Sequence, residues 1–238
     1  MTASLFAAPK TELDAVQVAL TGNSFARTLM ALRAGVRLAL NTDDTKQVFY
    51  LAIAIDGAGL CRNAARLAAD PCGRELMRER AAIDTRHVDY ARLRTLPADS
   101  LGGAYARALQ AKNLDPDLFQ APPGMPEDLA YVAQRARQTH DLWHVLTGFD
   151  TDIPGEIALQ AFSHEQNGLE FSRLIARYGQ LIFGLQYPRV FRMVKAGRAA
   201  GAAAPFLLAV RWEDHWDASL RELRVQLGLP AAGVWPAG

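Results

Sequence analysis

The sequence predicts an all-α protein, a single-domain helical bundle, and three observations lead to this expectation. Apolar residues recur at steps of three and four along most of the chain, the period of a helix with one buried face. Residues that favour helix ends stand at the limits of these series, such as Ser100 at a start and Gly148 at a stop. No segment shows a sustained period of two bounded by hairpin turns.

Each expected helix follows from such a series and its boundary residues. Pro154 suits a first helical turn, with Thr151 or Asp152 as its cap. Pro188 interrupts the next apolar series, and the Ala- and Gly-rich stretch Gly197–Ala204 indicates a loop. In the first half of the chain we expect one helix that carries Phe25 to Leu40 after a Ser24 cap and a second from about Asp43 to Gly57–Gly59. Further helices are expected over Leu60–Ala69, Gly73–Ala82, Leu101–Leu109 and Glu127–Thr147. The next starts at about Pro154, and the last covers Trp212–Leu227 and is ended by Gly228.

The length of 238 residues suits one domain. The proline-rich segment Asn113–Pro126 is either a linker between two domains or a loop inside one. We favour the loop, because each half of the chain alone would bury only a small core. The prediction is therefore one domain over residues 1–238.

Composition excludes several classes of protein. Lys and Arg number 26 and Asp and Glu 25, so the chain lacks the positive field that nucleic-acid binding needs. Cys61 and Cys72 form neither a thiolate metal motif nor a disulfide framework. The longest apolar run, Val48–Ile55, is far shorter than the roughly 20 residues of a membrane-spanning helix. Without a signal peptide at Met1–Lys10, we expect the chain in the cytoplasm.

The segment Glu127–Thr147 carries polar residues on its apolar stripe. At about 100° per residue, His140, Asp141 and His144 project within one arc of roughly 100°. Two histidines four residues apart point two imidazoles at one metal ion. A short turn then brings Glu156, in the first turn of the next helix, back towards that arc. The pattern predicts a metal site between two consecutive helices.

The predicted ligands are His140, Asp141, His144 and Glu156, and this set suits one divalent ion, zinc or iron. Asp141 either binds the ion directly or orients a ligating histidine. A lone pair of histidines at this spacing is most often chance, and Glu156 alone would only complement the positive end of its helix. A zinc peptidase is disfavoured, because Asp141 stands where those enzymes place a longer glutamate base.

Three further features carry alternatives. Arg137 lies on the same arc and is either a clamp for a substrate carboxylate or an ordinary ion-pair partner of Asp141. His164 either faces the site or is a core or surface residue. The basic and apolar segment Leu181–Lys195 either lies on a membrane surface or packs on the core.

The stretch from His140 to His144, with Glu156 twelve positions later, resembles the HDxxH-x11-E motif of the coenzyme Q (ubiquinone) biosynthesis protein four family. Asp128–Arg135, Leu101–Tyr105 and Leu223–Leu229 are similar to other segments of that family. The likeness runs from about Val48 onwards.

The resemblance implies a helical protein that binds a divalent metal through His140, Asp141, His144 and Glu156. It implies loss of the C1 carboxyl from a polyprenylated 4-hydroxybenzoate-type ring, coupled in the oxidative version to hydroxylation, with Asp141 and Glu156 catalytic. Peripheral association with the inner face of the membrane that holds this lipid, and participation in a ubiquinone biosynthesis complex, are also implied. The more polar stretch Phe162–Asn167 leaves ring substitution and tail length open.

Two hypotheses therefore stand. In the first, the chain is an enzyme whose metal ion stabilises negative charge that develops on the ring or its carboxylate. In the second, it is a non-catalytic scaffold that binds prenyl lipid and organises a ubiquinone biosynthesis complex, with a closed structural metal site. The large apolar content also allows a homodimer, although nothing in the sequence specifies one.

Overall fold

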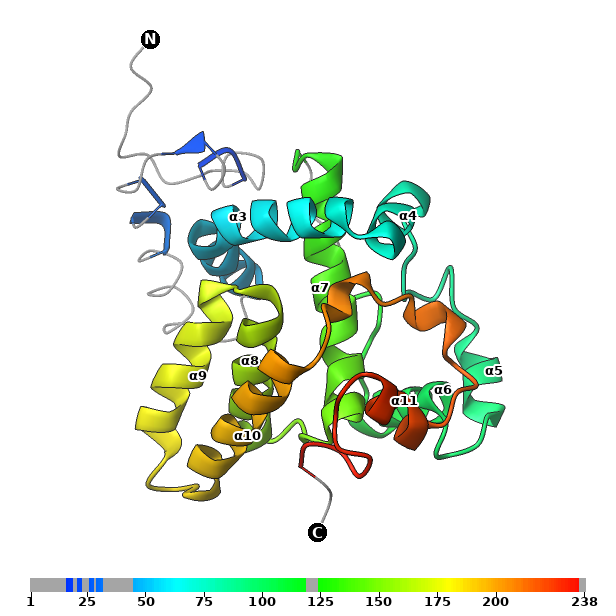
Figure 1. The fold of residues 1–238 in the computed structure, drawn as a ribbon. Coiled ribbons are helices and arrows are strands. Elements are labelled where there is room, and N and C mark those ends of the chain that lie inside the picture. Colours follow the sequence, from blue (N-terminus) through cyan, green and yellow to red (C-terminus); the bar gives the residue numbers. More distant parts are fainter. Residues whose placement is uncertain are drawn as a thin grey trace.

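The computed structural model describes residues 16–18, 21–22, 26–27, 29–31, 45–118 and 124–235, and these parts contain no β-strand. The predicted all-α fold class is confirmed. Figure 1 shows the arrangement of the helices. They are α3 (Thr45–Ala69), α4 (Pro71–Glu79), α5 (Tyr90–Thr95), α6 (Leu101–Lys112), α7 (Glu127–Thr147), α8 (Ile153–Asn167), α9 (Glu170–Phe183), α10 (Arg189–Ala203) and α11 (Leu220–Gln226), with short 3-10 helices η1 (Leu207–Ala209) and η2 (Trp212–Asp214).

The limits of α7 and the start of α8 lie close to the residues that the sequence indicates. Gly148 follows α7 in the left-handed conformation, and its N–H donates to the carbonyl of His144 at 2.8 Å. Asp152 caps α8 by accepting a hydrogen bond from the Gly155 N–H at 2.9 Å, and Pro154 lies in the first turn. The loop between these caps is short, so the end of α7 and the start of α8 lie close together.

α8 lies between α9 and α10, and glycines bring the neighbouring helices close to it (Figure 1). A Cβ atom at Gly197 would stand 2.6 Å from the carbonyl oxygen of Ala158, and one at Gly201 would stand 2.6 Å from that of Phe162. These glycines are four residues apart on α10 and therefore share one face. The backbones of α8 and α10 pack directly against each other at both positions.

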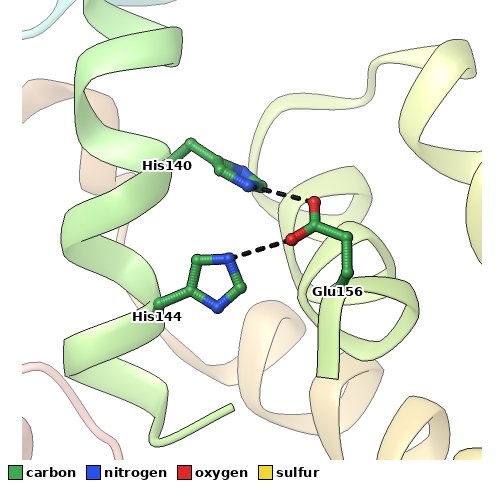
Figure 2. A group of neighbouring side chains, drawn as sticks. All are labelled: His140, His144 and Glu156. Carbon is green, nitrogen blue, oxygen red and sulfur yellow. Dashed lines mark hydrogen bonds and ion pairs between the residues drawn. The ribbon is translucent and has the colours of Figure 1, made fainter. Parts of the chain in front are cut away.

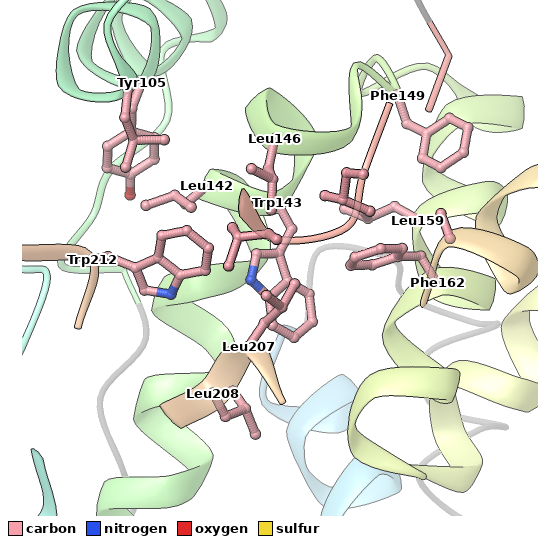
Figure 3. Close-up of a cluster of buried hydrophobic side chains, with 14 of the residues drawn as sticks. Tyr105, Leu142, Trp143, Leu146, Phe149, Leu159, Phe162, Leu207, Leu208 and Trp212 are labelled. Carbon is pink, nitrogen blue, oxygen red and sulfur yellow. The ribbon is translucent and has the colours of Figure 1, made fainter. Parts of the chain in front are cut away.

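The core joins both halves of the chain. Trp143 of α7 packs edge-on against Phe162 of α8, with ring centroids 5.7 Å apart. Leu207 of η1 and Trp212 of η2 belong to the same cluster and lie on the Trp143 side of it (Figure 3). Leu60 of α3 and Tyr105 of α6 belong to the same cluster, so segments before and after Asn113–Pro126 share one core. Each large side chain buried there contributes about 1.5–3 kcal/mol. The extent of the domain over residues 1–238 stays a prediction.

Hydrogen bonds connect the segment after η2 to the end of α7. Arg224 donates hydrogen bonds to the carbonyls of Leu146 at 2.8 Å and Val145 at 2.9 Å. The carbonyls in the last turn of a helix have no hydrogen-bond donor within that helix, and Arg224 supplies one here. The backbone N–H of Trp235 donates to the Thr147 carbonyl at 3.0 Å. These bonds hold Trp235 beside the α7–α8 loop.

Three of the sequence predictions about helix limits are wrong. α3 continues through Gly57–Gly59 to Ala69, because Gly59 is buried where a Cβ would stand 2.8 Å from Leu169. Gly197–Ala204 is not a loop, since α10 extends to Ala203 and uses its glycines for packing on α8. The helix expected over Trp212–Leu227 is divided into η2 and α11.

Other predicted helix boundaries differ from the observed ones, agree with them, or lie outside the described residues. The helix expected over Gly73–Ala82 is α4, which begins at Pro71 and ends at Glu79. Pro188 separates α9 from α10, as expected from its missing N–H. Most of the helix expected after Ser24, including Phe25, Leu32, Val36 and Leu40, lies outside the described residues, as does Asp43. Within the described parts, no helix combines the length and apolar character needed to cross a membrane.

Candidate metal centre

Two histidines of α7 converge on one carboxylate of α8 (Figure 2). His140 and His144 stand one turn apart on α7, and Glu156 lies in the first turn of α8. The Nε2 atom of His140 is 3.1 Å from Oε1 of Glu156, and Nε2 of His144 is 3.0 Å from Oε2. Both imidazoles are nearly buried, with 12% and 8% of the side chain exposed, while Glu156 is 38% exposed. The centre is therefore reachable from the carboxylate side.

The orientation of the His144 ring is fixed by the loop after α7. Its Nδ1 atom is 2.9 Å from the carbonyl oxygen of Phe149. Because a carbonyl only accepts hydrogen bonds, Nδ1 carries a proton and donates it. In the neutral ring this leaves the lone pair on Nε2, the atom that faces Glu156. Such a backbone partner is the usual means of fixing a ligating histidine.

The charges of the three groups are strongly coupled. Burial alone would raise the pKa of Glu156, but hydrogen bonds and charge from His140 and His144 hold it well below its ordinary 4.5. Burial alone would lower the pKa of His144, yet the hydrogen bond and charge of Glu156, with the Phe149 carbonyl, raise it above 6.5. Glu156 is thus held as an anion beside the two imidazoles.

The three side chains form a candidate site for a divalent ion. The nitrogen and oxygen ligand atoms of His140, His144 and Glu156 lie within 4.8 Å of one another. Bond lengths of about 2.0–2.2 Å place two ligand atoms of one ion roughly 3.0–3.4 Å apart, close to the two observed contacts. Two imidazoles and one carboxylate form a set used for zinc and for non-haem iron, with positions left open. The types and positions of these three residues therefore fit a single divalent ion.

Asp141 takes a different position from the one expected of a fourth ligand. Its carboxylate is outside the group formed by His140, His144 and Glu156, although its charge still raises the pKa of His144. Asp141 instead lines a neighbouring cavity together with His144. Direct binding of the ion by Asp141 stays a prediction.

The cavity beside the centre has a volume of about 390 Å³. Its apolar lining includes Leu109, Phe149, Met193 and Trp235. Lys112 and Arg189 line the solvent side, where they pair with Asp150 and Asp152 of the α7–α8 loop. The cavity thus has a wall that carries Asp141 and His144, an apolar body and a charged rim.

The remaining predicted site residues lie around this arrangement. Arg137 is half-buried, and its charge lowers the pKa of Tyr105, which burial raises well above 10.0. Arg137 does not line the cavity, so its role as a carboxylate clamp stays a prediction. His164 is outside the metal group and donates from Nδ1 to the Leu169 carbonyl at 2.9 Å.

Two contributors were not predicted from the sequence. The Phe149 carbonyl is one, and a backbone atom in a loop gives no pattern in the sequence. The other is Gln160, whose amide donates to Oε1 of Glu156 at 3.2 Å. Gln160 stands one turn after Glu156 on α8, so a search for polar partners at that spacing would have found it.

Comparison with known proteins places this site in a family. Residues 17–232 match the family model described as coenzyme Q (ubiquinone) biosynthesis protein Coq4. The human ubiquinone biosynthesis protein COQ4 homolog, mitochondrial, is 38% identical over 166 residues, which cover 68% of this chain and 62% of the human protein. The COQ4 protein of Meyerozyma guilliermondii is 28% identical over 219 residues, covering 87% of this chain and 67% of that protein.

A solved structure supports the same assignment. The crystal structure of a putative ubiquinone biosynthesis protein from Nostoc punctiforme matches with a TM-score of 0.67 and 29% sequence identity. The match covers 84% of this chain and 96% of the Nostoc chain. By the extent of the family match, the chain belongs to the coenzyme Q (ubiquinone) biosynthesis protein Coq4 family.

Proposed function

We propose that the chain acts in ubiquinone biosynthesis as a metal-dependent enzyme that removes the C1 carboxyl group from a polyprenylated 4-hydroxybenzoate-type ring. The observation that carries this proposal is the convergence of His140, His144 and Glu156 beside a largely apolar cavity. The family assignment, and the names of the human and Nostoc relatives, supply the pathway.

In this proposal, His140, His144 and Glu156 hold one zinc or iron ion. When bound, the ion supplies a Lewis acid that stabilises negative charge on the ring oxygen or carboxylate, and iron would also suit an oxidative version of the reaction. The Phe149 carbonyl keeps His144 in the tautomer that presents Nε2. Gln160 holds the Glu156 carboxylate in place.

The cavity suits the aromatic head of such a lipid. Its volume of about 390 Å³ lies at the small end of ligand pockets, roughly 300–1,000 Å³. That volume accommodates a substituted ring but not a long polyprenyl chain, so the tail stays outside. A tail of this kind remains in a bilayer, and we therefore place the enzyme peripherally at the membrane that holds its substrate.

Asp141 is the residue that we propose for proton transfer, because it lines the cavity beside His144. Transfer of a proton to C1 makes that carbon tetrahedral; the bond from C1 to the carboxylate then breaks, carbon dioxide leaves, and the bonding electron pair returns to the ring. In the simple decarboxylation, Asp141 is the residue that delivers this proton to C1. In the oxidative version, one atom of dioxygen goes to C1 and the other leaves as water, so that carbon dioxide is lost and the ring is released as the quinone. A positioned acid or base of this kind typically contributes 10²–10⁴-fold in rate.

The proposal is tested by release of carboxyl-labelled carbon dioxide from a ring that bears a short prenyl chain. We expect Glu156→Gln to lose measurable turnover and Asp141→Asn to fall at least 100-fold, within the range typical of a proton-transfer residue. Glu165→Gln is the matched control, since Glu165 is exposed on the same helix as Glu156. If wild type binds metal but releases no carbon dioxide, the scaffold function replaces the enzymatic one.

A further inference from the structure

Exposed apolar side chains gather on the α9–α10 hairpin. Of the eight large hydrophobic side chains that are exposed among the described residues, five lie there. They are Tyr178 (53% exposed), Leu181 (69%), Ile182 (69%), Leu185 (97%) and Phe191 (51%), and we call these five residues the apolar tip. Most soluble proteins scatter exposed apolar residues singly, so a cluster of this kind indicates an interaction surface.

The apolar tip is a continuous stripe and not a by-product of core packing. Tyr178, Leu181, Ile182 and Leu185 follow one another at helical spacing, so they share a face of α9 and its turn. The face that packs inward carries Ser172, Ala176 and Gly179, on roughly the opposite side of the helix at about 100° per residue. α9 therefore has two apolar faces, of which the second has no partner within the described structure.

Basic residues surround this stripe. The segment from residue 170 to residue 203 contains a single acid, Glu170, which pairs with Arg173. Against it stand six basic residues, namely Arg173, Arg177, Arg189, Arg192, Lys195 and Arg198, all of them exposed. The combination of an exposed apolar stripe and a basic rim is the composition of surfaces that lie on anionic bilayers.

The start of α10 connects the apolar tip to the rim of the cavity. Arg189 begins α10 four residues after Leu185, and it both lines the cavity and pairs with Asp152 at the start of α8. Ile153, the first residue of α8, is also exposed. Figure 1 shows the α9–α10 turn at the lower end of the molecule, towards which α7 also runs.

We infer that the apolar tip and its basic rim form the surface that docks on an anionic lipid bilayer, with the rim of the cavity turned towards that bilayer. A lipid whose ring enters the cavity then leaves its tail in the membrane. This last step rests on the proposed function, whereas the docking itself does not. A second copy of the chain is a poorer occupant, because an isologous contact would bring the two basic rims against each other.

The inference is tested by flotation of the purified chain with vesicles of phosphatidylcholine alone or of phosphatidylcholine with phosphatidylglycerol. We expect wild type to float with the anionic vesicles and much less with the neutral ones. The double variant Ile182→Glu/Leu185→Glu should bind the anionic vesicles at least tenfold more weakly. Val225→Glu is the matched control, because Val225 is 60% exposed on α11 and should leave binding unchanged.

A second variant separates charge from apolar contact. Arg192→Gln/Lys195→Gln should weaken binding to anionic vesicles roughly 25-fold, since each basic residue near such a surface contributes a factor of about five. Equal flotation of wild type and both double variants would overturn the inference. Sedimentation velocity tests the competing occupant, a second copy of the chain. If wild type is a dimer that does not bind vesicles, and Ile182→Glu/Leu185→Glu dissociates this dimer, the surface is a contact between two copies.

Turnover distinguishes failure of this inference from failure of the proposed function. With a short-tailed substrate in detergent, wild type and Ile182→Glu/Leu185→Glu should release carbon dioxide equally. With a long-tailed substrate in anionic vesicles, the variant should be at least tenfold slower. If wild type floats with the vesicles but turns over neither substrate, the docking surface stands and the enzymatic proposal falls.

Discussion

His144 and His164 occupy the same local structure at the ends of two successive helices. In each case Nδ1 donates to the carbonyl of the fifth residue along, at 2.9 Å, and a left-handed glycine follows the histidine by four residues. The surroundings differ. Nε2 of His144 faces the Glu156 carboxylate, whereas His164 lies outside the metal group.

The comparison shows that ring orientation and metal binding are separate properties. The helix end fixes the ring in both places, because the motif uses only a backbone carbonyl and a glycine. The carboxylates nearby behave in opposite ways. Glu156 has its pKa lowered by two imidazoles, while Asp56, whose pKa the charge of His164 only partly lowers, has its pKa raised by burial.

Exchange of each histidine for alanine gives the largest expected difference. His144→Ala should lower metal affinity by more than the 10–100-fold typical of groups that only orient a ligand, and turnover should disappear. His164→Ala should keep the metal and lose about 1 kcal/mol of stability through one hydrogen bond. The check is metal content per chain after reconstitution. Equal metal content in the two variants would remove His144 from the centre.

The next largest effect is the change of stability with pH that Asp56 produces. Asp56 of α3 is buried and accepts the N–H groups of Glu170 at 2.6 Å and Phe171 at 3.2 Å, at the start of α9. Burial raises its pKa from 3.8 to about 6, so the folded state holds the proton more tightly than the unfolded state. The resulting stability is present below pH 3.8 and is lost as the pH rises through about 6.

The matched variant for this effect is Asp56→Asn, which keeps the shape and the acceptor but does not ionise. Relative to this variant, wild type should lose about 3 kcal/mol of unfolding free energy across that interval. Urea unfolding of both proteins at several pH values measures the difference. A difference that stays constant with pH would show that Asp56 does not titrate in this range.

Replacement of Gly148 or Gly168 by alanine should give the smallest change in stability, and it should separate the effect on stability from the effect on metal binding. Gly148 has φ of 80° and Gly168 has φ of 62°, so alanine at either position should cost about 1–2 kcal/mol of stability. Only Gly148→Ala should also weaken metal binding, because it displaces the Phe149 carbonyl that holds His144. Urea unfolding and metal titration measure the two consequences separately. Equal weakening of metal binding in both variants would contradict this account.

The parts of the fold that the sequence predicts correctly are those fixed by local interactions. Gly148, Asp152 and Pro154 set the limits of α7 and α8 through backbone geometry within a few residues. The continuity of α3 through Gly59 and of α10 through Gly197 depends instead on contacts with distant segments. Glycine is a weak helix former in isolation, and only the packing that removes a Cβ reverses this preference.

The same distinction applies to the site. Helical spacing brings together His140 and His144, and a short loop returns Glu156 to them. The separate position of Asp141 was not predicted, because an arc of roughly 100° is wide enough to span both the metal group and the cavity beside it. The cavity itself needs side chains from α6, α10 and the segment around Trp235, whose approach no local pattern specifies.

The close approach of α10 to α8 has a consequence for mutational tolerance. Gly197 packs against Ala158, two residues after Glu156, and Gly201 packs against Phe162, so any side chain at either glycine would push against the backbone of the helix that carries Glu156. A saturation scan of α10 should therefore find two strongly intolerant positions four residues apart. The effect of a genetic variant at either glycine should therefore be interpreted as a displacement of α8.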